Sequence, residues 1–180
     1  GRLWSDSTDR GVYRTTDGGK SWTQVLGGNA STGCGGMSVD AKNPDVMFAS
    51  LWDFRRKGWT FRSGGEGPDA PSGSGLYRSA DGGKTWNEVT GGGLPAKPYG
   101  RIAVAVAPSN SNVVYAFIEG VKGALFRSDD GGKTWDRRDD SQMMVWRPFY
   151  FANLIVDPAN ADRVFKTNLG LIQSLDGGKT

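Results

Sequence analysis

The chain has 180 residues, a formal net charge of +3, 28 glycines, 7 tryptophans, no histidine and one cysteine, Cys34. This composition excludes His-based catalytic triads, His-ligated zinc sites, internal disulfides and cysteine metal clusters, so we expect no metal ion and no cofactor. No apolar run has membrane-spanning length, which predicts no membrane insertion, and the mild charge makes a nucleic-acid partner a weak alternative.

One glycine-rich motif occurs four times along the chain. It occupies Thr15–Trp22, Ser79–Trp86, Ser128–Trp135 and, without the final tryptophan, Ser174–Thr180. The intervals from Asp81 to Asp130 and from Asp130 to Asp176 fall in the range of roughly 40–50 residues that is typical of propeller blades. The interval from Asp17 to Asp81 is longer, because an insertion and an inter-blade loop lie within it.

The residues between the motifs divide into short β-rich segments joined by turn formers. The second repeat predicts strands at Gly36–Asp40, Val46–Trp52, Gly75–Ser79 and Thr85–Thr90. The third repeat predicts strands at Arg101–Ala107, Val113–Glu119, Ala124–Ser128 and Thr134–Arg138.

The pattern predicts an all-β fold, a β-propeller with four-stranded antiparallel blades. We expect residues 1–180 to form one partial domain, an incomplete ring of about three to four blades from a larger propeller. The blades are expected at residues 1–26 (part), 36–90, 101–138 and 151–180 (part).

The repeated motif itself is typical of a folded turn. Its aspartate can accept hydrogen bonds from nearby backbone N–H groups, its glycines permit positive φ, and its tryptophan can cover a neighbouring sheet. The expected structural residues are Asp17, Trp22, Asp81, Trp86, Asp130, Trp135 and Asp176. A calcium loop fits poorly because Gly28 stands where the final ligand is needed, and a catalytic carboxylate would not be required four times.

The motif resembles the Asp box of bacterial neuraminidase repeats, which occurs in sialidases, xyloglucan-active glycoside hydrolases and the sortilin family. The fuller pattern is most similar to secreted bacterial sortilin-like propellers, often labelled glycosyl hydrolases. The stretches that carry the resemblance are Gly11–Trp22, Asn43–Trp59, Ser74–Trp86 and Gly100–Trp135. The resemblance implies a secreted, extracellular or periplasmic protein whose ligands meet the face opposite the boxes.

The active sites of these enzymes do not carry over to this chain. Sialidase-like proteins have an Arg-Ile-Pro-type motif, whereas this chain has Arg101-Ile102-Ala103 and Arg147-Pro148-Phe149. The catalytic aspartates of the xyloglucan enzymes match no position here. The resemblance therefore implies a fold more strongly than an activity.

Three loops on the face opposite the boxes contain candidate ligand-binding residues. Cations and aromatic rings alternate in the insertion after Trp52, and similar residues occur in loops 91–100 and 139–150. The candidates are Arg55, Arg56, Trp59, Phe61, Arg62, Tyr99, Trp146, Arg147 and Tyr150. They could bind an acidic peptide, an anionic glycan or a neighbouring subunit, or their aromatic rings could pack between blades.

These observations predict a non-catalytic extracellular scaffold that binds protein, peptide or glycan, with the remaining blades or another subunit as partner. The alternative is a carbohydrate-active hydrolase with carboxylates on the loop face. A glycosidase needs two carboxyl groups roughly 5–10 Å apart. Asp53 and Glu119 lie near equivalent ends of second strands in adjacent blades, so they are the candidate pair.

Overall fold

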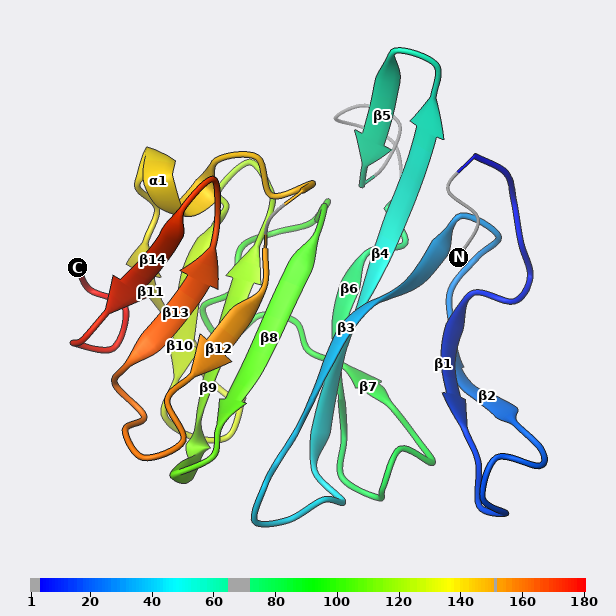
Figure 1. Ribbon diagram of the computed structural model, residues 1–180, viewed down its shortest axis with the longest axis horizontal. Helices are drawn as coiled ribbons and strands as arrows, with labels where there is room; N and C mark the ends of the chain where they lie inside the picture. Colours follow the sequence, from blue (N-terminus) through cyan, green and yellow to red (C-terminus); the bar gives the residue numbers. More distant parts are fainter. Residues whose placement is uncertain (1–3, 65–71, 151) are drawn as a thin grey trace.

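The computed structural model describes residues 4–64, 72–150 and 152–180, which form four antiparallel sheets arranged side by side (Figure 1). The first sheet pairs β1 (Gly11–Arg14) with β2 (Thr23–Gly27). The second contains β3 (Thr32–Val39), β4 (Met47–Lys57), β5 (Thr60–Ser63), β6 (Gly75–Ser79) and β7 (Asn87–Glu88). The third contains β8 (Ile102–Ala107), β9 (Asn110–Ile118), β10 (Ala124–Ser128) and β11 (Asp136–Asp139). The fourth contains β12 (Leu154–Val156), β13 (Val164–Thr167) and β14 (Leu171–Ser174), and a short helix α1 (Gln142–Val145) precedes it.

Apart from β5, which pairs only with β4, strands that follow one another along the chain are hydrogen-bonded neighbours within each sheet, as in the order β11-β10-β9-β8. The first strand of the third sheet, β8, contacts the first strands of the sheets on either side, β3 and β12, so the sheets radiate from a common inner edge. This is the arrangement of propeller blades, and the predicted all-β propeller fold is confirmed. The described sheets form part of a ring and do not close it.

The insertion after Trp52 differs from the loop that the sequence predicts. Strand β4 continues to Lys57 and pairs with β5, from Phe54 opposite Ser63 to Lys57 opposite Thr60. A two-residue turn joins them, in which Gly58 has a φ of 50°. The insertion therefore begins as a β-hairpin that projects beyond the other blades in Figure 1.

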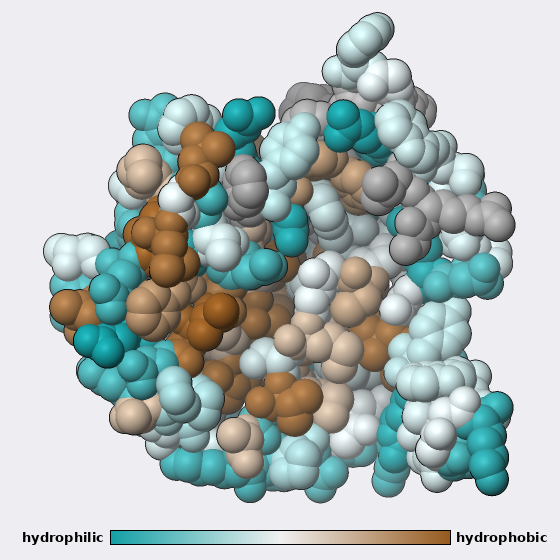
Figure 2. Space-filling view, in the orientation of Figure 1, coloured by the Kyte–Doolittle hydropathy of each residue, from teal (hydrophilic) through white to brown (hydrophobic). Residues whose placement is uncertain are grey.

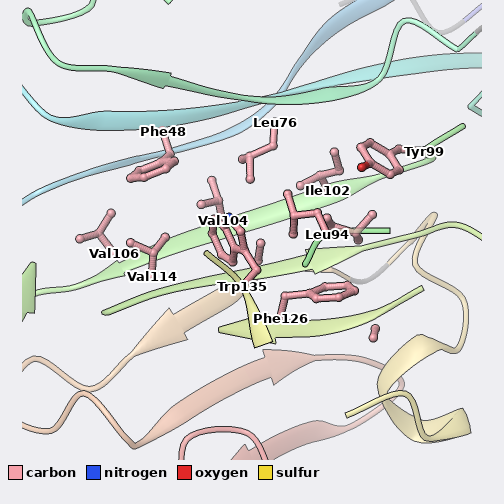
Figure 3. Close-up of a cluster of buried hydrophobic side chains, with 13 residues drawn as sticks. Phe48, Leu76, Leu94, Tyr99, Ile102, Val104, Val106, Val114, Phe126 and Trp135 are labelled. Carbon is pink, nitrogen blue, oxygen red and sulfur yellow. The ribbon is translucent and has the colours of Figure 1, made fainter. Parts of the chain in front are cut away.

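Buried clusters fill the spaces between blades. One cluster joins Phe48 and Leu76 of the second sheet to Val104, Phe126 and Trp135 of the third (Figure 3). A second cluster lies between the third and fourth sheets, and a third lies between the first and second. The blades are thus held together by apolar packing between sheets.

Across the three described ranges, no helix has both the length and the apolar character needed to cross a lipid bilayer.

Candidate functional site

Each motif aspartate is held within its own turn. In the third repeat, Asp130 Oδ1 accepts hydrogen bonds from the backbone N–H groups of Lys133 and Thr134, both at 2.9 Å. Its Oδ2 accepts from Thr134 Oγ1, and Ser128 Oγ donates to Oδ1. These hydrogen bonds hold the pKa of the Asp130 carboxyl well below its usual range. The same bonds recur in the other three motifs, so these carboxylates serve the turn itself.

The turns of the motif and the candidate loops lie at opposite ends of the blades. We call one end the box face and the other the loop face, which carries the β4–β5 hairpin, the turn at Gly120–Gly123 and residues 140–150 (Figure 1). The inner strands between them expose apolar side chains, including Met37, Val39 and Ile155. Figure 2 shows apolar residues gathered across the middle of this inner side within a hydrophilic rim. The inner side therefore offers mainly apolar contact, and hydrophilic residues lie around it.

A polar network on the loop face joins the second and third blades. Trp52 Nε1 donates to Ser63 Oγ at 2.9 Å, and Ser63 Oγ donates to Glu119 Oε2. The backbone N–H of Arg101 donates to the same carboxylate oxygen at 2.7 Å. The hairpin strand β5 is thereby attached to the end of β9.

The Arg101 guanidinium extends this network to the connection between the third and fourth blades. It lies over the Trp52 ring, 5.0 Å from the centroid, and donates to the carbonyl of Phe149 at 3.0 Å. The Phe149 ring contacts Trp52 at 5.5 Å and Tyr150 at 5.0 Å between centroids. Arg147, whose φ is 49°, stacks in turn over Tyr150 at 5.4 Å. Segments from three parts of the chain therefore form one row of stacked rings and guanidinium groups.

A pocket of about 340 Å³ opens beside this network. Its described lining consists of Ser63, Gly64, Pro98, Tyr99, Gly100, Glu119, Gly120 and Val121. Glu119 is half-buried, and burial raises the pKa of its carboxyl because the charged form is less well solvated there. A half-buried carboxylate in a pocket of this size can bind a small donor group.

Two of the sequence motifs match a model of the BNR/Asp-box repeat, at residues 77–88 and 126–137. These motifs are Asp-box repeats on propeller blades. A search of curated proteins found no match to this chain.

Solved structures of similar fold are β-propeller proteins. The GH74 xyloglucanase from Xanthomonas campestris is 22% identical, with a TM-score of 0.65 over 97% of this chain and 25% of that one. The GH74 enzyme of Niastella koreensis is 17% identical, with a TM-score of 0.64 over 98% and 26%. YCF48 bound to D1 peptide is 16% identical, with a TM-score of 0.55 over 83% and 38%. These likenesses show the fold, and the chain spans about a quarter of the length of the two GH74 proteins.

The structure separates the two candidate carboxylates of the Asp-box chain. Asp53 is only 3% exposed, and its carboxylate accepts hydrogen bonds from Ser31 Oγ at 2.9 Å and from the Gly73 N–H at 3.1 Å. Glu119 instead lines the pocket. Asp53 therefore serves the interior of its own blade, whereas Glu119 faces a space that a ligand could enter.

The candidate ligand-binding residues also have different surroundings. Trp59, at the hairpin tip, is fully exposed, and Arg56 lies over the Trp4 ring at 5.7 Å. Arg55 is 6% exposed and forms an ion pair with the exposed Asp6, so its guanidinium is engaged within the chain and little of it reaches the surface.

The remaining candidate ligand-binding residues also include both exposed and buried side chains. Trp146 and Tyr150 are exposed, and Tyr99 is buried at the wall of the pocket. The side chains of Phe61 and Arg62 lie outside the described residues.

Sequence reasoning missed Trp52, Ser63 and Arg101 as members of the site. Trp52 and Arg101 lie at the loop-face ends of predicted strands, and this position could have indicated that they belong to the site. Ser63 had no comparable signal, because its partners come from another strand and another blade. In the part of the chain that the structure describes, no group of three or more acidic or cysteine side chains could hold a metal ion.

Proposed function

We propose that this Asp-box chain is a non-catalytic binding module whose loop face binds an acidic peptide segment of a partner protein. The observation that carries the proposal is a set of three guanidinium–aromatic pairs on that face. The pairs are Arg56 over Trp4, Arg101 over Trp52 and Arg147 over Tyr150. Trp59 adds a fully exposed ring at the hairpin tip.

The chemistry of these pairs favours carboxylates. A guanidinium that stacks on a ring keeps its N–H donors at its own edge, in the guanidinium plane, where they can bind a carboxylate at two points. Stacking also orders the side chain before binding, which lowers the entropy that a ligand must overcome. Exposed aromatic rings beside the cations supply apolar contact with the rest of a peptide. Peptide binding is compatible with this fold, since YCF48, a protein of similar fold, is bound to a peptide.

A hydrolase remains the second candidate, because GH74 enzymes share the fold and burial raises the pKa of the Glu119 carboxyl. A glycosidase mechanism requires a second carboxyl group about 5–10 Å from the first. Among the described residues that line the pocket, Glu119 is the only carboxylate. This lining favours a binding function over hydrolysis. If the protein released reducing ends from xyloglucan, hydrolysis would become the preferred function.

Fluorescence anisotropy with a labelled glutamate-rich peptide tests the proposal. The control peptide has glutamine in place of glutamate and should bind more weakly. Arg147→Gln and Trp59→Ala should each weaken binding by about 3–10-fold, since each removes one cation–π or apolar contact. Raised salt should also weaken binding, because the contacts are exposed to solvent.

The matched control is Lys133→Gln, which removes the same unit charge from an Asp box on the opposite face. It should leave peptide binding unchanged. Equal losses of peptide affinity in Lys133→Gln and Arg147→Gln would show that binding depends only on the net charge of the protein. The proposed loop-face site would then be wrong.

We propose in addition that a further blade or another subunit covers the two outer sides of this array. Trp22 is 59% exposed on the first blade, whereas the equivalent Trp135 is buried against the preceding blade. At the other side, Leu171 and Leu175 are exposed on the fourth blade. The secreted location and the sortilin-like affiliation that the sequence resemblance implies stay predictions.

A further inference from the structure

The pocket beside Glu119 differs from the arginine-rich surface around it. Its described lining contains one carboxylate, that of Glu119, together with Ser63, Pro98, Tyr99, Val121 and three glycines. The two hydrogen bonds that the Glu119 carboxylate accepts from described residues both end on Oε2, from Ser63 Oγ and from the backbone N–H of Arg101. Oε1 receives no donor from the described part of the chain.

The neighbouring cation favours the ionised form of this carboxylate through its charge but is held by other partners. The Arg101 guanidinium lies over Trp52 and donates to the carbonyl of Phe149. Within the described ranges it forms no ion pair with Glu119. Burial raises the pKa of the Glu119 carboxyl despite the two hydrogen bonds on Oε2 and the charge of Arg101, so its lost hydration is only partly replaced. A cation that enters the pocket would therefore be stabilised by the carboxylate.

The lining offers few donors for an anionic or acceptor ligand. The Tyr99 hydroxyl donates to the carbonyl of Pro95, and the Ser63 hydroxyl is used by Glu119. The side-chain group left for a ligand is therefore an acceptor. Its natural partner is a donor with positive charge.

Glycines keep the pocket open. A Cβ at position 100 would lie 2.3 Å from Glu119 Oε2, and one at position 64 would lie 2.8 Å from the carbonyl oxygen of Tyr99. The volume of about 340 Å³ is at the lower end of the range for ligand sites, which suits one side chain and not an extended polymer.

We propose that this pocket binds the cationic head group of a lysine or arginine side chain, with Glu119 Oε1 as the acceptor. The inference rests on the proposed function only for the source of the side chain, a peptide that lies across the loop face. The arginine–aromatic pairs would bind acidic residues of that peptide, and the pocket would bind one basic residue between them. The charge of the pocket is opposite to that of the surrounding surface, so the pocket would make recognition of the peptide more specific.

Nuclear magnetic resonance titration with side-chain probes tests the inference without any peptide. The probes are N-acetyl-lysine methylamide, its arginine equivalent, and the isosteric norleucine compound, which lacks the charge. We expect the lysine or arginine probe to shift the amide signals of Gly100, Gly120 and Val121, and the norleucine probe to leave them unchanged. A neutral xyloglucan oligosaccharide serves as a fourth probe.

Glu119→Gln should weaken binding of the cationic probe by about 10-fold or more, the loss expected for a hydrogen bond to a charged group. Asp136→Asn, which removes an equal charge on the outer strand β11, should leave it unchanged. Equal binding of the norleucine or xyloglucan probe, or full binding by Glu119→Gln, would overturn the inference. The probe comparison uses the unmodified protein, so it decides the question even if a variant fails to fold. Because it uses no acidic peptide, its failure is separate from failure of the proposed function.

Discussion

Trp135, the last residue of the third Asp box, lies in the same buried cluster as Phe48 of the preceding blade (Figure 3). Gly132 of that box also approaches this ring, since a Cβ there would lie 2.8 Å from Phe48 Cζ. The box therefore has two structural roles. It closes a turn within one blade, and it places a large ring against the preceding blade.

Trp135→Ala should destabilise the fold by about 3–5 kcal/mol, because it opens a cavity at a blade interface. Trp22→Ala is the matched control, since Trp22 occupies the same box position but is largely exposed. The control should cost less than about 1 kcal/mol. Urea unfolding followed by far-UV circular dichroism measures both changes. Equal effects of the two substitutions would contradict a role for Trp135 in joining blades.

The exposed outer sides predict self-association of the 180-residue chain. Trp22 and Leu171 lie on the first and fourth blades, where equivalent positions inside the array are covered by a neighbouring blade. The double variant Trp22→Ser, Leu171→Lys should shift the population toward monomer, because it places polar groups on surfaces that favour apolar partners. Sedimentation velocity measures the shift. A parent chain that is already monomeric at all tested concentrations would contradict this prediction.

The sequence predicted the blades well because the signals that define them are local. An Asp box closes its turn with hydrogen bonds from residues at most four positions away, so its geometry is present in the motif itself. Most predicted strands match observed strands with shifts at their ends, as for Val113–Glu119, observed as β9. Turn chemistry of this kind is readable without tertiary contacts.

The hairpin and the site were not predictable in the same way. Pairing of Phe54 with Ser63 depends on the rest of the sheet, and Gly58 alone did not indicate where the chain reverses. The bond from Ser63 to Glu119 joins residues of adjacent blades. Nothing in one sequence shows such a partnership, because it depends on how whole blades pack.

The boxes also predict how stability changes in acid. Hydrogen bonds hold the pKa of Asp130 and of its equivalents Asp17, Asp81 and Asp176 below the ordinary value of 3.8. A carboxyl with a lowered pKa in the folded state stabilises the fold above the unfolded-state value, and the contribution is lost as the pH falls through the folded-state value. We expect the melting temperature to fall steeply below about pH 4.

Asp81→Asn and Asp130→Asn together should lower the melting temperature at pH 7 and flatten its decline in acid, because an amide does not titrate. Asp136→Asn is the control, since Asp136 is an exposed acid outside any box. Thermal melts between pH 2 and pH 7 measure the profiles. A parallel profile in the double variant would contradict the assignment of acid sensitivity to the boxes.

The last prediction concerns Lys166, which is 2% exposed between the third and fourth blades. Its ammonium lies over the Phe117 ring at 4.5 Å and donates to the carbonyl of Thr167 at 3.3 Å. Burial, with a smaller effect from Arg101, lowers its pKa from 10.5 to about 8. The folded state therefore releases this proton at a lower pH than the unfolded state does, and stability should rise as the pH increases from about 8 to about 10.5.

Lys166→Met should stabilise the fold by roughly 1–3 kcal/mol at pH 7, because it replaces a buried charge with an apolar side chain of similar length. The gain should shrink toward pH 10, where the native lysine is already neutral in the folded state. Burial also raises the pKa of Tyr77, Tyr99 and Tyr115, and the difference between variant and parent removes their contribution. Chemical unfolding of both proteins at pH 7, 8, 9 and 10 gives this difference. A gain that stays constant across the range would show that Lys166 stays charged in the folded protein, and a loss of stability would show that its ammonium supports the blade interface.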